Sequence, residues 1–313
     1  MLVAVVGGAV GLVLLAYASD QFVIGAARTA ALLRLSPVVI GAVVIGFGTS
    51  APELLVSGIA AGQGSLDIGV GNIVGSNIAN LSLVLGAAAL FTPIAVRGPV
   101  LRREAPISLG AVVLFALLLQ GTFGRPEGVA LLVALGVALW LILRSARGGD
   151  PTLTAEVDEF VTEGPPSSRR ETVRVALGLT GTLAGAWLLV EAATTIAREV
   201  GLAEGFVGLT IVAIGTSLPE LATAVQAARK GETDLIVGNL LGSNLFNSGA
   251  VGGAVALIGP GTAADPTLTG LATILMVAVA ALATFLMATG RRVVRWEGAV
   301  LLLGYLAVMP LLA

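Results

Sequence analysis

Two stretches of this sequence are copies of each other. Residues 41–87 align without a gap with residues 208–254 at an offset of 167, and 21 of the 47 aligned positions are identical. The identities include polar residues, since GTSAPEL at 48–54 matches GTSLPEL at 215–221 and GNIVGSNIAN at 71–80 matches GNLLGSNLFN at 238–247. Apolar segments can match through composition alone, whereas Thr, Ser, Pro, Glu and Asn do not recur together by chance. The sequence therefore indicates an internal duplication and a fold with two related halves.

The copies lie in a chain that lacks the polar surface of a soluble protein. It is 56% hydrophobic and 12% charged, with a mean hydropathy of +0.99, whereas soluble domains carry about a quarter charged residues. Lipid is therefore expected to cover the outside. The absence of Cys and His excludes disulfides and thiolate metal sites and removes the usual proton relay near neutral pH. We read residues 1–18 as part of the first spanning helix and not as a signal peptide, because no Lys or Arg precedes this apolar run.

Apolar runs long enough to cross a bilayer, about 20 residues each, occur ten times. They lie near residues 2–26, 37–61, 67–91, 104–122, 126–143, 173–197, 206–228, 235–258, 267–289 and 296–312. If helix ends alternate between sides, fifteen of the 17 Lys and Arg residues fall on one side, and only Arg125 and Arg198 on the other. Because Lys and Arg favour the cytoplasmic side, we expect a multi-pass protein of the cell membrane with both termini outside and the central loop in the cytoplasm.

The duplication divides the chain into a first five-helix repeat at 1–143, a cytoplasmic linker at 144–172 and a second five-helix repeat at 173–313. Because five is odd, the second repeat enters the membrane from the opposite side, a common plan of secondary transporters. The predicted fold is an all-α polytopic membrane protein of ten transmembrane helices, built as two inverted repeats with broken helices 2 and 7. The linker reads as a disordered segment, with a regulatory cation sensor as the alternative.

Each copy of the first motif combines a helix break with a carboxylate. Pro52 and Pro219 lack an N–H and clash with the carbonyl four residues earlier, so each interrupts its helix. Freed carbonyls, together with Thr and Ser hydroxyls, are oxygen donors that suit Na⁺ and Ca²⁺. Glu53 and Glu220 follow the prolines at mid-span, where a carboxylate costs ~3 kcal/mol or more and indicates function; the alternative is a protonated Glu that stabilises helix packing. Two carboxylates would neutralise one Ca²⁺ or two Na⁺, which provides a simple basis for exchange.

The second motif places small polar residues at four-residue spacing, and therefore on one helical face. Ser76, Asn80, Ser243 and Asn247 are candidates to complete a calcium shell of six to eight oxygens. Asn72, Asn77, Asn239 and Asn244 either contribute to a site or simply bridge helices. Asp67 and Asp234 are expected to be helix N-caps or mouth residues, and Asp20 and Glu191 interfacial or helix-pairing residues.

These two motifs closely resemble the alpha repeats of the calcium/cation antiporter superfamily, in particular the sodium/calcium exchangers of the prokaryotic type without a large regulatory loop. The resemblance implies an antiporter working by alternating access, with helices 1 and 6 sliding against the remaining bundle. By position it implies ion ligands at Gly46, Thr49, Ser50, Glu53, Ser76 and Asn80, and at Ala213, Thr216, Ser217, Glu220, Ser243 and Asn247. The Gly and Ala positions would contribute backbone carbonyls. Some members carry Asp where this chain has Asn247, so the site here keeps two carboxylates.

The expected function is therefore exchange of Ca²⁺ for Na⁺, with these ions as substrates and no cofactor. We expect a protein that is not an enzyme, that sits in a lipid bilayer, binds no nucleic acid and works as a monomer. The nearest alternative is a proton-coupled or potassium-dependent Ca²⁺ exchanger of the same superfamily. A cation channel is a distant alternative, because channels usually build their filter from rings of identical subunits. An intramembrane enzyme is more distant still, because without Cys or His only Ser or carboxylate chemistry remains.

Overall fold

The structure is a computed structural model that describes residues 2–33, 49–145, 167–231 and 233–312. Almost every described element is helical. The longer helices are α1 (Leu2–Leu32), α4 (Ala51–Gly62), α5 (Leu66–Ala79), α8 (Glu104–Leu118), α9 (Arg125–Ser145), α11 (Ser168–Val200), α14 (Leu218–Lys230), α15 (Thr233–Phe246), α17 (Thr273–Gly290) and α18 (Arg295–Val308). The shorter ones are α6 (Leu85–Phe91), α7 (Gly98–Arg102), α12 (Glu204–Val207), α13 (Ala213–Thr216), α16 (Gly252–Ile258) and the 3₁₀ turn η7 (Met309–Leu312).

In the part of the chain that the structure describes, four π-helical turns interrupt the α-helices: η2 (Asn80–Val84), η4 (Gly208–Val212), η5 (Asn247–Val251) and η6 (Leu268–Ala272). The sequence expectation of an all-α fold holds except for a ribbon of two antiparallel strands, β1 (Ile94–Ala95) and β2 (Arg292–Val293). This ribbon joins the start of α7 to the loop before α18, and so ties segments about 200 residues apart in the sequence.

Seven stretches of the described residues are long and apolar enough to cross a membrane: 2–30, 66–91, 125–144, 168–200, 233–258, 268–290 and 295–312. An eighth is formed by the helical segments 204–216 and 218–229, which are bent by 40° at the break between α13 and α14. Helix α8 has 15 residues and α4 is a short apolar helix of 12, so neither is among these spans. The chain is therefore a mostly helical, multi-pass membrane protein with seven or eight apolar spans in its described part.

The two copies of the repeat fold into the same succession of elements. The segment α5–η2–α6 begins at residue 66 and α15–η5–α16 at residue 233, and the π turns begin at Asn80 and Asn247, which all differ by the offset of 167. These two spans are the most interior, with 83% and 78% of their apolar window buried, against 22–39% for the other five. The polar motif of each copy therefore runs through the centre of the bundle.

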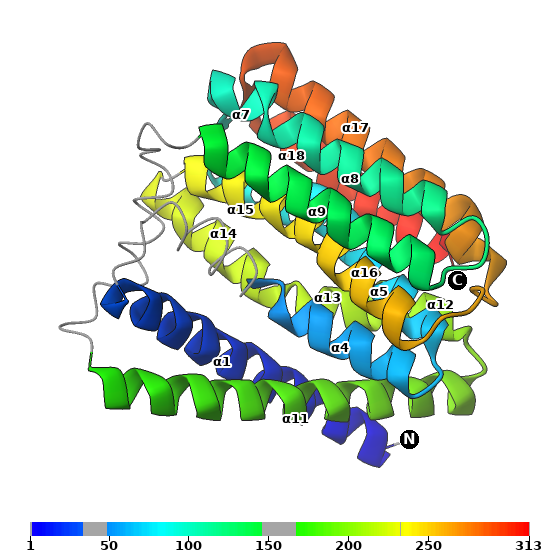
Figure 1. Cartoon of the computed structure of the whole chain (residues 1–313). Coiled ribbons are helices and arrows are strands. Elements are labelled where there is room, and N and C mark those ends of the chain that lie inside the picture. The colour runs from blue at the N-terminus through cyan, green and yellow to red at the C-terminus, as the bar shows by residue number, and fades with distance from the viewer. Residues whose placement is uncertain (1, 34–48, 146–166, 232, 313) are drawn as a thin grey trace.

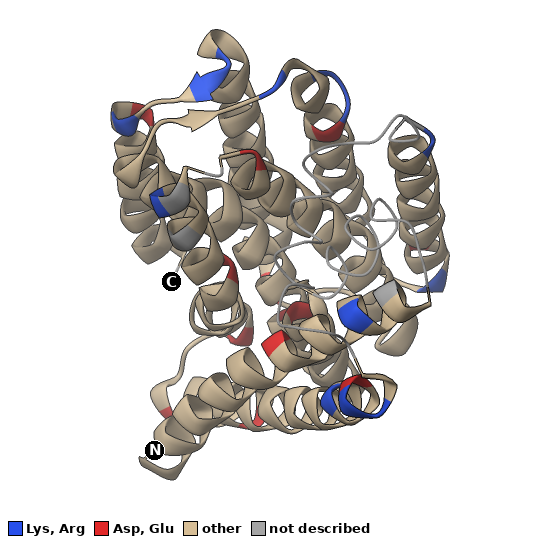
Figure 2. Cartoon of the chain, turned by 90° about the vertical axis from the view of Figure 1, so that its left-hand side faces the viewer, with Lys and Arg blue, Asp and Glu red and all other residues tan. Residues whose placement is uncertain are grey.

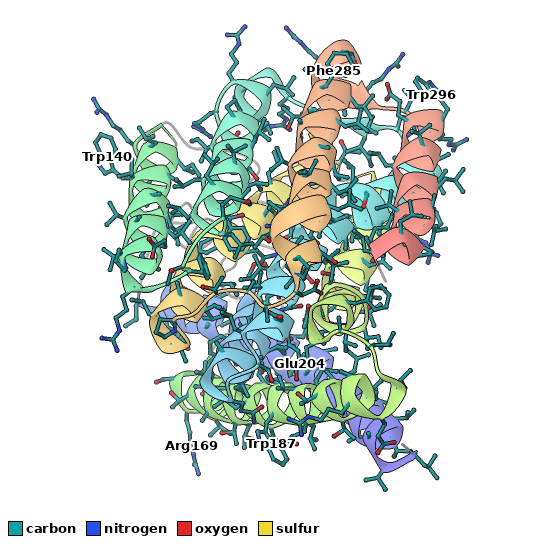
Figure 3. The ribbon with its side chains drawn as sticks, turned by 90° about the vertical axis from the view of Figure 1, so that its right-hand side faces the viewer. Trp140, Arg169, Trp187, Glu204, Phe285 and Trp296 are labelled. Atoms are coloured by element: carbon teal, nitrogen blue, oxygen red, sulfur yellow. The ribbon has the colours of Figure 1, made fainter. Side chains whose placement is uncertain are left out.

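The outer helices surround this centre and carry the lipid-facing surface. Trp140, Phe285 and Trp296 project outward from α9, α17 and α18 (Figure 3), each with more than half of its side chain exposed. Helices α1 and α11 form a separate crossed pair along one side of the bundle (Figure 1). Small residues permit their close approach: a Cβ on Gly185 would lie 2.6 Å from the backbone nitrogen of Leu15.

Lys and Arg gather at one end of the bundle. Figure 2 views that end, where the basic residues lie at the ends of several helices. Arg28 differs from the others that the structure describes, because its side chain is fully buried and its Nε donates to Oε1 of Glu171 at 2.8 Å.

Candidate functional site

The two motif carboxylates occupy equivalent places. Glu53 lies in the first turn of α4 and Glu220 in the first turn of α14, each immediately after the proline that starts its helix. The residues before these helices, Ser50 and Ser217, share a non-helical backbone with φ near −90° and ψ near 0°. The predicted break is present between α13 and α14, whereas the residues before Thr49, which would complete the other break, lie outside the described residues. Both α4 and α14 begin beside a proline and hold their glutamate in the first turn, near the positive end of the helix dipole.

Both carboxylates are buried without an ion pair. Glu53 and Glu220 are each 1% exposed, and within the described part of the chain neither makes a hydrogen bond or a salt bridge from its carboxylate oxygens. The charge of Glu220 acts on Glu53, and the Thr216 hydroxyl lies close to Glu53. Both acids therefore face the protein interior and not the lipid, and their meeting at one site stays a prediction.

Hydroxyl and amide groups from the opposite copy surround each break. Thr216 Oγ1 donates to Asn72 Oδ1 at 3.1 Å and lies 3.4 Å from Ser76 Oγ, and all three residues are fully buried. The equivalent pair, Thr49 Oγ1 to Asn239 Oδ1, is longer at 3.5 Å and less buried. The first break of one copy thus packs on the polar helix of the other, and the two motifs form one cluster.

The amides further along the polar helices meet at the same centre. Asn80 Nδ2 donates to Asn244 Oδ1 at 3.0 Å, and Asn244 Nδ2 donates to the Asn77 carbonyl at 3.1 Å. Asn72 also donates to Ser57 at 2.9 Å. Asn72, Asn77 and Asn244 therefore do bridge helices, as one of the two interpretations of their sequence spacing expected.

Buried polar atoms without a hydrogen-bond partner concentrate on the predicted site residues. Such atoms occur on Ser50, Glu53, Asn80, Ser217, Glu220, Ser243 and Asn247, which are seven of the twelve residues predicted from the sequence. Burying an unpaired polar group costs about 1–3 kcal/mol each. Nearly all of these atoms are oxygens, the donor type that hard cations such as Na⁺ and Ca²⁺ require, so the cluster has the chemistry of a cation site.

Two predicted carbonyl donors fare differently. The carbonyl of Ala213, a predicted ion ligand, accepts an ordinary helical hydrogen bond from Ser217 N at 3.0 Å. It also accepts a hydrogen bond from Thr216 Oγ1 at 3.3 Å, so it is engaged within its own helix in this conformation. Gly46 lies outside the described residues.

The structure gives different partners to the acids Asp67 and Asp234. Asp67 does not cap its own helix: its carboxylate accepts from Ala264 N at 2.9 Å and Asp265 N at 2.8 Å. Asp234 pairs with Arg97 at 2.6 Å on the surface. Within the described part of the chain, no group of three or more acidic side chains is placed to hold a metal ion.

Sequence reasoning missed the π turns that begin at Asn80 and Asn247. A π turn widens the helix and is frequent at functional sites, and here one occurs at the equivalent predicted ligand of each copy. The offset of 167 could have indicated that both copies would share such a feature, but no residue pattern in either copy signals a π turn.

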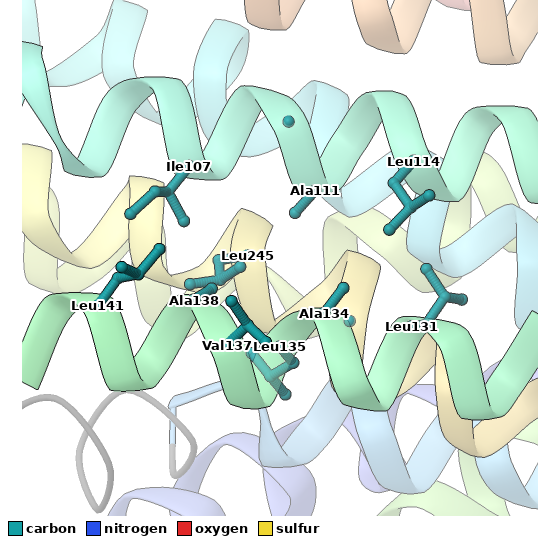
Figure 4. A pocket seen from close by; sticks show the side chains of 12 residues that line it. Ile107, Ala111, Leu114, Leu131, Ala134, Leu135, Val137, Ala138, Leu141 and Leu245 are labelled. Atoms are coloured by element: carbon teal, nitrogen blue, oxygen red, sulfur yellow. The ribbon is translucent and has the colours of Figure 1, made fainter.

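Two cavities adjoin this centre. A small one of about 40 Å³ is lined by Ser19, Asp20, Val23, Thr49, Pro219, Glu220, Thr223 and Asn239. A larger one of about 320 Å³ lies between α8 and α9 and is backed by α15 (Figure 4), and it is lined by residues without polar side chains. Of the two, only the small cavity reaches a motif carboxylate.

Known proteins match this chain over nearly its whole length. The family described as sodium/calcium exchanger protein matches residues 3–144 and 171–312. A protein described as an antiporter, CaxA of Alkalimonas amylolytica, is 43% identical over 100% of this chain and 99% of its own. The sodium/calcium exchanger MaX1 of Methanosarcina acetivorans is 30% identical over 96% of each chain. A solved structure of the sodium-calcium exchanger NCX_Mj, soaked with Na⁺ and Sr²⁺, has a TM-score of 0.69 and 31% identity, covering 99% of this chain and 98% of that one.

Proposed function

Because this chain belongs to the sodium/calcium exchanger protein family, an antiporter family and not a family of enzymes, we propose that it exchanges Ca²⁺ for Na⁺ across the cell membrane by alternating access. The observation that carries the proposal is the buried pair Glu53 and Glu220, whose four carboxylate oxygens have no partner among the described residues. A pair of carboxylates in a dry interior favours a bound cation strongly over an empty site, and two charges match one Ca²⁺ or two Na⁺.

The proposed site takes one half of its ligands from each copy of the repeat. Side-chain oxygens come from the residues predicted in the sequence, and Gly46 and Ala213 would contribute carbonyls. The polar contacts between Thr216 and Asn72, and between Thr49 and Asn239, support a site shared by both copies. Alternating access would then come from helices 1 and 6 sliding against the bundle that holds this site.

The finer architecture belongs to the same proposal. We infer ten transmembrane helices in two inverted five-helix repeats, at 1–143 and 173–313, joined by a cytoplasmic linker at 144–172. Helix α8 and the span that includes α4 would supply the two spans beyond the eight described above. The basic helix ends in Figure 2 support a cytoplasmic location for that end of the bundle, with both termini outside, and a single chain would be the working unit.

The nearest alternative is coupling to protons, because Glu53 and Glu220 can also bind H⁺. The deciding experiment uses the purified protein in liposomes loaded with a fluorescent calcium indicator. Ca²⁺ uptake should follow an imposed Na⁺ gradient and should not follow a pH gradient without Na⁺. Uptake driven by the pH gradient alone would overturn sodium coupling, and uptake that needs K⁺ with Na⁺ would indicate a potassium-dependent exchanger.

The site assignment has its own test. Glu53→Gln and Glu220→Gln keep the shape of the side chain and remove its charge, so both should abolish Ca²⁺ uptake while the protein still inserts and elutes as a single species. Glu191→Gln is the matched control, because Glu191 is an exposed acid on the spanning helix α11. Normal uptake by both motif variants would show that the site lies elsewhere.

A further inference from the structure

The small cavity beside Glu220 joins the buried carboxylate to a second acid. Its polar lining consists of Ser19 and Asp20 of α1, Thr49 of the first helix break, Glu220 and Thr223 of α14, and Asn239 of α15. A volume of about 40 Å³ exceeds the roughly 10–15 Å³ that one water needs. The cavity can therefore hold water or a partly hydrated cation next to Glu220.

The cavity lies on the side of Glu220 that leads to the basic end of the bundle. Thr223 is one turn beyond Glu220 along α14, and the same helix continues to Arg229. From Asp20, α1 likewise continues toward the buried Arg28. Because Lys and Arg mark the cytoplasmic side, the cavity extends from the carboxylate toward the cytoplasm.

The other carboxylate, Glu53, does not line this cavity. Its flank is occupied by the buried contacts of Thr216 with Asn72 and Ser76. The equivalent contact on the cavity side, Thr49 with Asn239, is 0.4 Å longer, and both residues line the cavity. The contact on the cavity side is thus the looser of the two.

Asp20 is an exposed acid about 18 Å from the C-terminal end of α1 by helical rise. Gln21 donates to its carboxylate at 3.2 Å. A charged side chain at such a depth is retained where it faces water or an ion pathway, and the cavity supplies that surrounding. A negative charge beside such a cavity raises the local concentration of cations.

We propose that Asp20 attracts cations from the cytoplasmic side into the cavity and passes them to Glu220, so that it sets the apparent affinity on that side alone. Asp20 is not a ligand of the final site in this proposal, which rests on the proposed cation exchange. Its contribution is electrostatic and of long range, and it is therefore screened by salt.

The test measures Ca²⁺ transport from each face separately, in inverted and right-side-out membrane vesicles. Asp20→Asn should raise the half-saturating Ca²⁺ concentration at the cytoplasmic face several-fold, up to about tenfold, and leave the maximal rate and the outer face unchanged. The difference from the parent should shrink as choline chloride is added. Asp20→Glu should restore the parental value, and Glu191→Gln, an acid that does not line the cavity, should match the parent.

The outcomes separate this inference from the proposed function. If the parent transports Ca²⁺ and Asp20→Asn behaves like the parent, or changes both faces equally, the inference about Asp20 fails and the exchange function stands. A loss that Asp20→Glu does not restore, or that salt does not reduce, would also overturn it, because a packing role predicts that pattern. If the parent transports no Ca²⁺ under any gradient, it is the proposed function that fails.

Discussion

Arg28 and Glu171 form an ion pair, 2.8 Å between Nε and Oε1, in which both side chains have no exposed surface. The partners are 143 residues apart and join α1 to α11, the crossed pair on one side of the bundle. Glu171 also lies in the first turn of α11, where the helix dipole favours a negative charge. The pair therefore links the two outer helices at their basic end.

Removing one member of this pair should destabilise the protein strongly. Glu171→Gln removes the carboxylate charge that the buried Nε of Arg28 contacts, and breaking a buried pair in this way costs ~3–5 kcal/mol. We expect a clear fall in the melting temperature in detergent. The double variant Arg28→Met/Glu171→Met should be more stable than Glu171→Gln, because it leaves no buried charge.

A suitable control is Glu104→Gln, since Glu104 pairs with its neighbour Arg103 and both side chains are about one-fifth exposed. A pair that keeps some contact with solvent contributes less than a fully buried one, so this variant should melt closer to the parent than Glu171→Gln. If Glu171→Gln and Glu104→Gln had equal melting temperatures, burial of the Arg28–Glu171 pair would not make it contribute more to stability than the Arg103–Glu104 pair.

Gly75 is the closest contact between the polar helix α5 and the break of the other copy. A Cβ at this position would lie 2.2 Å from the carbonyl oxygen of Leu209 and 2.6 Å from the Cβ of Ala213. Because backbone atoms cannot move aside, Gly75→Ala should separate α5 from η4 and α13 and displace Thr216. We expect poor folding, and loss of Ca²⁺ uptake in any protein that is recovered.

Gly136 of α9 provides the control, because a Cβ there meets nothing within 4 Å among the described residues. Gly136→Ala should fold and transport like the parent. Normal yield and uptake for Gly75→Ala would mean that α5 and η4 are less closely packed than the structure indicates.

The arrangement of the motifs was predictable because it depends on short-range chemistry and on the duplication. Pro52 and Pro219 fix where α4 and α14 begin, and the glutamate that follows each proline in the sequence therefore lies in the first turn. Burial of Glu53 and Glu220 followed from their place in apolar sequence without a basic neighbour.

The features that the sequence did not predict depend on contacts between distant residues. Arg28 reads as one more cytoplasmic basic residue, and only packing of α1 on α11 reveals its partner. The π turns at Asn80 and Asn247 are equally hidden, because no local propensity distinguishes them from α-helix. The offset of 167 also predicts equal environments for equivalent residues, and the structure shows unequal ones for Thr49 and Thr216.

This inequality leads to a prediction for the two threonines. Thr216→Val removes the shorter of the two hydrogen bonds to the buried Asn72 Oδ1 and leaves it the longer one from Ser76 Oγ at 3.5 Å. A buried group that is poorly satisfied costs up to about 1–3 kcal/mol. Thr216→Val should therefore lower both the melting temperature and the apparent Ca²⁺ affinity, and Thr216→Ser should largely restore them. Thr49→Val removes a longer and more exposed bond, so it should lower the affinity with a smaller loss of stability. Equal losses of stability would show that the two halves are symmetric in solution.

The equivalent acids Asp67 and Asp234 provide the other matched pair. Asp67 on α5 accepts two backbone N–H groups, from Ala264 and Asp265, and so holds the loop before η6 against the polar helix. Hydrogen bonds to a charged group contribute about 1.5–3 kcal/mol each, and partial exposure of this loop reduces their contribution. Asp67→Ala should therefore lower the free energy of unfolding by about 1–2 kcal/mol. Among the described residues, Asp234 makes an exposed pair with Arg97, and Asp234→Ala should cost about 0–1 kcal/mol.

Thermal unfolding of both variants in the same detergent compares them directly, and proteolysis of the loop at 259–267 should become faster in Asp67→Ala alone. If Asp234→Ala proved the more destabilising of the two, Asp67 would not hold this loop in solution, and the difference between the two copies at this position would be reversed.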